Sequence, residues 1–147
     1  SFVETKETMS DYIPAPLRQQ VYERAGGQCE YCLIPQTAVL VSLEVDHVVA
    51  RKHGGETKEN NLACACSLSN KYKGSDLASI DLDSEEIVPL FHPRRQRWQD
   101  HFRLQDAQIV PLTAAGRVTV NLLQLNQPDR VAEREILLAA EAIQLPE

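Results

Sequence analysis

Four polar residues have types and spacings that could support hydrolysis. Asp46 and His47 are adjacent, and Asn61 and Asn70 follow at intervals of fourteen and nine residues. A carboxylate can hold a hard divalent cation, and an imidazole with an ordinary pKa of about 6.5 can remove a proton from water near neutral pH. Neighbouring residues of a strand point to opposite faces, so this pair can serve one site only where the strand ends. The Gly54-Gly55 pair shortly afterwards favours such an end.

The four cysteines form a second pattern. Cys29 and Cys32 make a CxxC knuckle, and Cys66 could begin a second one, but the position three residues later is Ser69. A serine hydroxyl is a poor zinc ligand compared with a thiolate. Cys64 could complete a metal site if this segment is extended, since it would then share a face with Cys66. A metal-free group of buried cysteines is the alternative, and a redox-active CxxC pair lacks the expected βαβ context.

Local signals predict the elements that position these residues. A helix from about Ala15 to Arg24 should have Pro14 and Pro16 at its first turn, present Leu17 and Val21 on one face, and end at Gly26-Gly27. The β-branched segment 37–50 should contain one or two strands reaching about Val49. A short helix should begin near Ser67 and end at Gly74. The expected order is helix, knuckle, hairpin and short helix.

The second half of the chain predicts further strands and helices. Short strands are expected at Ile87–Phe91 and around Ile109, and a helix should be capped by Thr113. The last helix should have Asp129 as its N-cap and an apolar face that belongs to the core, with a dimer contact as the alternative. That face comprises Ala132, Ile136, Ala139 or Ala140, and Ile143.

Composition is that of an ordinary globular protein. Apolar residues make up 43% and charged residues 24% of the 147 residues. No apolar run approaches the roughly 18 residues of a membrane helix, and the N-terminal residues do not resemble a secretory signal. We therefore expect a single α+β domain over residues 1–147, free of the membrane and cytoplasmic. A core at about 11–80 and a C-terminal extension at about 81–147 are its expected parts.

The net charge of −6 does not exclude a nucleic-acid partner, because the basic residues are unevenly distributed. Nine of the fifteen Lys and Arg residues lie between Arg51 and Arg103. A local basic surface on an acidic protein is sufficient to contact phosphates.

The stretch "CEYC…LEVDHVVARKHGGETKENNLACACSLSNKYKG" resembles the HNH endonucleases, the ββα-metal nucleases. The motifs cover about residues 29–74, and the segment from Ser79 onward resembles the C-terminal part of a bacterial subgroup. This resemblance implies a ββα-metal core with an N-terminal helix and a C-terminal extension of strands and helices. It also implies metal-dependent hydrolysis of DNA phosphodiester bonds.

The resemblance assigns a role to each motif residue. His47 would be the general base, Asp46 and Asn70 would hold one Mg²⁺ or Mn²⁺ ion, and Asn61 would orient the loop around His47. Cys29, Cys32 and Cys66 would be three of four structural zinc ligands, with Ser69 departing from the fourth.

Basic side chains near this motif are candidate nucleic-acid contacts. Lys71 and Lys73 lie on the predicted short helix, and Arg94, Arg95 and Arg97 lie in "HPRRQRW". The alternative is that they are solvent-exposed residues that contact no nucleic acid.

Two other functions fit parts of the pattern. One is an HNH-fold module that binds nucleic acid without cutting it, which the intact Asp46, His47 and Asn70 disfavour. The other is a zinc-ribbon adaptor, which the incomplete cysteine set disfavours. A monomer with one site should nick one strand at a time, and a homodimer would carry two sites.

Overall fold

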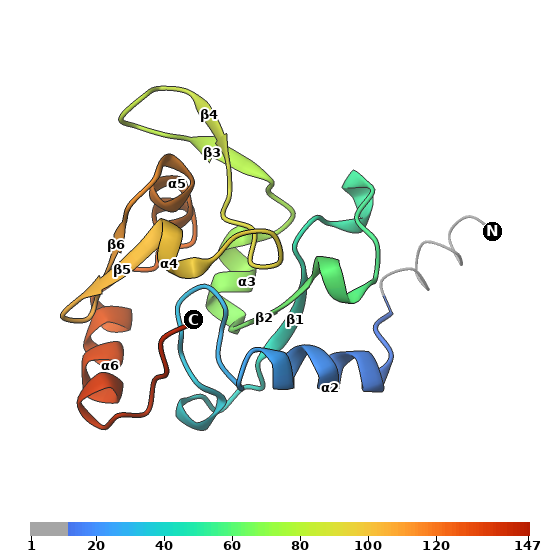
Figure 1. Ribbon diagram of the computed structural model, residues 1–147, viewed down its shortest axis with the longest axis horizontal. Coiled ribbons are helices and arrows are strands. Elements are labelled where there is room, and N and C mark those ends of the chain that lie inside the picture. Colours follow the sequence, from blue (N-terminus) through green and yellow to red (C-terminus); the bar gives the residue numbers. More distant parts are fainter. Residues whose placement is uncertain (1–11) are drawn as a thin grey trace.

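A computed structural model describes residues 12–147, and its centre is a β-hairpin covered by a short helix (Figure 1). Strand β1 (Glu44–His47) pairs antiparallel with β2 (Leu62–Ala65), and α3 (Ser67–Lys73) packs against β1. Helix α2 (Ala15–Arg24) lies across the same hairpin. The fold is α+β, as expected from the sequence, and the predicted order of these elements is confirmed. Within residues 12–147, no helix is long and apolar enough to cross a membrane.

Helix α2 has the predicted bounds because its local signals agree. Prolines occupy its first turn, and Gly26 and Gly27 follow it with φ of 65° and 68°, a conformation that favours glycine. Val21 is buried with Leu62 and Cys64 of β2. This contact attaches α2 to the hairpin.

Strand β1 is shorter than predicted. A 3₁₀ turn occupies Gln36–Ala38, and Leu40 and Val41 are exposed, so only the last residues of the β-branched segment pair in a sheet. The strand ends at His47, which is opposite Leu62 in the register. This early end is the condition under which Asp46 and His47 can serve one site.

The connection from β1 to β2 contains two 3₁₀ turns, Arg51–His53 and Glu59–Asn61. Gly54 has a φ of 90°, and a Cβ atom at Gly55 would lie 1.7 Å from the carbonyl oxygen of Val49. Only glycine fits there, so the Gly-Gly pair allows this loop to fold tightly against the end of β1.

The second half contains two more hairpins and three helices, shown on the far side of α3 from α2 in Figure 1. The elements are β3 (Ala78–Ile80), β4 (Ile87–Pro89), α4 (Trp98–His101), β5 (Phe102–Gln105), β6 (Gln108–Pro111), α5 (Ala114–Leu122) and α6 (Pro128–Ala139). The strands predicted near Ile87 and Ile109 are present. Their partner strands β3 and β5 were not predicted from the sequence.

Helix α5 has the predicted cap, whereas α6 corrects two predictions. The Thr113 hydroxyl accepts a hydrogen bond from the Gly116 amide. In α6, however, the N-cap is Gln127 and Asp129 lies inside the first turn. Of the face predicted to be apolar core, the alanines and Ile136 are exposed, with Ile136 at 71%, whereas Ile143 lies beyond the helix and packs partly buried against the core. The helix instead buries Arg130 and Arg134, whose guanidinium groups find buried carbonyl partners.

The main hydrophobic core joins the knuckle to the C-terminal half. Tyr31 and Leu33 pack in one cluster with Phe91, Trp98 and Phe102. The Trp98 indole N–H donates to the Tyr31 carbonyl over 3.1 Å. The two sequence segments therefore share one core, while the boundary near residue 80 stays a prediction.

Candidate active site

Asp46 lies in β1, and its buried side chain, 5% exposed, packs beneath α3. Its Oδ2 atom lies 3.0 Å from Nζ of Lys73, and it accepts a hydrogen bond from the Tyr31 hydroxyl over 3.2 Å. Burial raises the pKa of Asp46, and the positive charge of Lys73 opposes that rise. The two partners hold the carboxylate in place.

Lys73 does not fit its prediction as a phosphate contact. Its side chain is 1% exposed because the last turn of α3 directs it inward to Asp46. Nζ also donates to the carbonyl oxygen of His47 over 3.3 Å. Lys73 therefore connects the two residues of the Asp-His pair from inside the protein.

Asn70 lies on the same side of β1 as Asp46. Its Nδ2 donates to Oε1 of Glu44 over 2.6 Å. Glu44 and Asp46 are two residues apart in β1 and so share a strand face, which α3 covers. This face therefore gathers carboxylate and amide oxygens, the donor set that hard divalent cations prefer.

His47 ends β1 and is half-buried. Its Nε2 lies 2.9 Å from Oγ1 of Thr57, and the two atoms share a hydrogen bond. Thr57 belongs to the loop after the Gly-Gly pair, so the loop conformation fixes the plane of the imidazole ring.

Asn61 holds that loop in shape. Its Oδ1 accepts from the Val49 amide, and its Nδ2 donates to the carbonyl oxygens of Val49 and Glu56, each over 2.9 Å. The side chain is buried and makes all three bonds within the loop. Asn61 therefore has contacts that fit a role in fixing the conformation of the loop.

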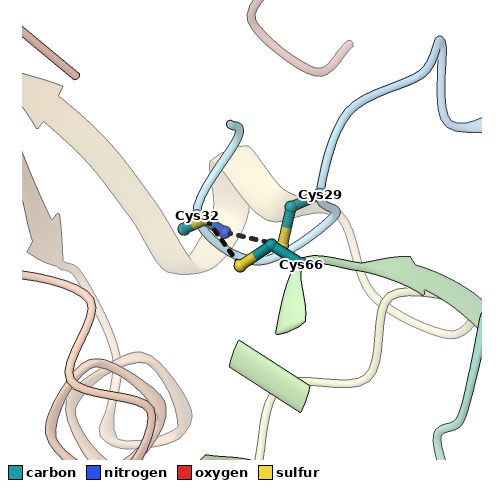
Figure 2. A group of neighbouring side chains, drawn as sticks. All are labelled: Cys29, Cys32 and Cys66. Carbon is teal, nitrogen blue, oxygen red and sulfur yellow. Dashed lines mark hydrogen bonds between the residues drawn. The ribbon is translucent and has the colours of Figure 1, made fainter. Parts of the chain in front are cut away.

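Cys29, Cys32 and Cys66 form a buried group, with sulfur atoms all within 4.8 Å of one another. Figure 2 shows the first two on the knuckle loop facing Cys66, which lies just beyond β2. The sulfur atoms of Cys32 and Cys66 are 3.6 Å apart. Hydrogen bonds with Cys29 and Cys66 lower the pKa of Cys32 well below its usual range, while burial raises the pKa of Cys29. Three thiols at these separations could hold a metal ion.

A comparison with protein-family models matches residues 29–76 to the family described as HNH endonuclease. The matched segment runs from the knuckle through β1, β2 and α3, and so contains the Asp-His pair and both asparagines. This segment, about a third of the chain, is therefore similar to the HNH endonucleases. Searches of the curated proteins and of the solved structures gave no match.

The cysteine knuckle lacks a fourth thiol at position 69, as the sequence indicated, and Cys64 does not replace it. Cys64 packs with Val21 and Leu62 beneath α2, away from the other three thiols. The same-face argument for Cys64 and Cys66 fails because β2 ends at Ala65 and Cys66 begins the turn into α3. Ser69 stays beside Cys66, whose thiol donates to the serine hydroxyl over 3.3 Å.

The other basic residues predicted to contact phosphates differ in exposure. Arg95 and Arg97 are exposed, as is Lys71 on α3. Arg94 is largely buried and pairs with Glu30 of the knuckle, and burial lowers its pKa to about 10. Arg94 therefore has a structural partner already, and the exposed cations are the better candidates for phosphates.

Four residues of the site were not predicted from the sequence. Tyr31 and Glu44 contact the predicted cation ligands, Thr57 contacts His47, and Arg130 contacts Cys66. The alternation of strand residues could have identified Glu44, which stands two positions before Asp46. The other three contacts span long intervals of sequence that no local pattern encodes.

Proposed function

We propose that the protein is a metal-dependent endonuclease that hydrolyses DNA phosphodiester bonds. The observation that carries the proposal is the end of β1 at His47, beside a strand face on which Glu44 and Asp46 meet Asn70 of α3. The HNH match over residues 29–76 supports it.

Asp46 and Asn70 fit the role of ligands to Mg²⁺ or Mn²⁺. Both offer oxygen, and Glu44 engages the amide nitrogen of Asn70, which leaves the amide oxygen as the ligand atom. When bound there, the cation would stabilise the negative charge that develops on the phosphate and on the leaving oxygen.

Protein side chains would supply the proton transfer and the contacts to the DNA. His47 would remove a proton from the attacking water, with its ring oriented by Thr57. Asn61 would keep the loop and therefore Thr57 in position. Lys71, Arg95 and Arg97 would contact phosphates on either side of the cut, which gives affinity without reading the base sequence.

The test is cleavage of supercoiled plasmid in Mg²⁺ or Mn²⁺, with EDTA as the control. We expect nicked circles first, because one site cuts one strand at a time. His47→Ala should lose nicking, and His53→Ala should keep it, because His53 is an exposed histidine in the same loop.

Two results would contradict the proposal. Full activity of His47→Ala would remove His47 from the mechanism. Intact DNA binding without cutting in either metal would favour the non-cutting HNH module instead. The homodimer and the cytoplasmic location stay predictions, and sedimentation would test the first.

A further inference from the structure

A buried arginine lies against the cysteine group, and it comes from outside the HNH domain. Arg130 of α6 is 8% exposed. Its Nη2 donates to Oγ of Ser69 over 2.8 Å and lies 3.6 Å from Sγ of Cys66. Ser69 itself is 0% exposed. Ser69, which stands where the fourth cysteine of the zinc site is expected, is thus the residue that accepts the hydrogen bond from Arg130.

The other terminal nitrogen of the Arg130 guanidinium is held by two backbone carbonyls. Its Nη1 donates to the carbonyl oxygens of Leu123 and Gln124 over 2.8 and 3.0 Å, where the chain leaves α5. A guanidinium held at both ends cannot move away without leaving buried donors unpaired. Its place beside the sulfur atoms is therefore part of the fold.

This arrangement disagrees with a structural zinc ion. Zinc in such knuckles takes four ligands, and here the fourth position offers a serine hydroxyl that already accepts from Arg130. The same hydroxyl also accepts from the thiol of Cys66, so two protein donors compete with a metal ion for its lone pairs. Conversely, without a metal the arginine supplies the positive charge that a thiolate in a buried cluster requires.

We propose that Arg130 and Ser69 together replace the fourth thiolate and the zinc ion, so that this knuckle is metal-free. The knuckle is closed by hydrogen bonds to a guanidinium from α6 in place of metal–sulfur bonds. The C-terminal half consequently completes a part of the HNH domain that a zinc ion would otherwise hold together.

The primary test is the zinc content of the purified protein after expression in zinc-supplemented medium, measured by elemental analysis. We expect only trace zinc in the wild type. Stoichiometric zinc that survives dialysis against a weak chelator would overturn the proposal. This measurement needs no variant, so it stands even where a substitution prevents folding.

The second test rebuilds the four-cysteine site. Ser69→Cys combined with Arg130→Met should bind zinc close to stoichiometrically, and Co²⁺ should give the visible absorption of a tetrathiolate site. The matched control is Ser67→Cys with Arg134→Met, because Ser67 is exposed on α3 and Arg134 donates to the carbonyls of Ala107 and Leu125. The control should stay zinc-free.

Failure of the folded Ser69→Cys/Arg130→Met variant to bind zinc would show that position 69 is not the fourth vertex, and would also overturn the proposal. Neither test depends on cleavage. The inference and the proposed nuclease function can therefore fail separately.

Discussion

Replacing Lys73 with methionine tests the buried ion pair at the centre of the site. Lys73 and Asp46 are 1% and 5% exposed, and Nζ lies 3.0 Å from Oδ2. Methionine keeps much of the side-chain volume but removes the charge. Asp46 would then keep the Tyr31 hydroxyl as a hydrogen-bond donor, with no cation to offset its burial.

The expected loss follows from the burial of both groups. Removing one partner of a buried pair costs about 3–5 kcal/mol, because an uncompensated charge is left inside. At about 2–4 °C per kcal/mol for a chain of this size, the melting temperature should fall by roughly 10 °C. Lys71→Met, on the exposed side of the same helix, should change stability by less than about 0.5 kcal/mol.

The stability lost in Lys73→Met should also depend on pH. Burial raises the pKa of Asp46 in the folded protein, and Lys73 opposes that rise, so the substitution raises the pKa further. A carboxyl with a folded pKa above its unfolded value destabilises the fold at high pH, and the penalty disappears once the carboxyl is protonated in both states. The Lys73→Met penalty should therefore be largest near neutral pH and shrink as the pH falls through the raised pKa.

Urea denaturation of the wild type, Lys73→Met and Lys71→Met at several pH values would measure this. The double variant Asp46→Asn/Lys73→Met should recover part of the loss, because it removes the stranded charge. A Lys73→Met penalty below about 1 kcal/mol at neutral pH would refute the buried pair, given the 3–5 kcal/mol expected. A penalty of constant size across the pH range would refute the electrostatic explanation.

Three further predictions concern the loop and the exposed cations. Asn61→Ala removes three hydrogen bonds and should cost about 3 kcal/mol, at about 1 kcal/mol per bond, in a denaturant titration. Gly55→Ala places a methyl group 1.7 Å from the Val49 carbonyl oxygen, so it should slow nicking through a displaced loop, and unchanged cleavage would argue against this geometry. Arg95→Ala and Arg97→Ala should each reduce the slope of log K against log salt by about 0.9 and weaken binding equally on unrelated DNA sequences, which fluorescence anisotropy can measure.

Local signals in the sequence determined helices α2, α3 and α5 and the order of the motif residues. The bounds of α2, the Thr113 cap of α5 and the end of α3 before Gly74 follow from prolines, caps and glycines that act within a few residues. The fold class and the HNH resemblance depend on residue types in a fixed order, which a sequence states directly.

The tertiary structure alone decided which way the charged and sulfur-bearing side chains point. Lys73 resembles Lys71 in sequence, yet only Lys73 meets a buried carboxylate across the β1–α3 contact. Arg130 is buried although the opposite face of α6 was predicted to be core, and its hydrogen-bond partners include Cys66 and Ser69, more than sixty residues away. Such partners are brought together by packing between distant segments, and the free energy of burying a charge depends on them.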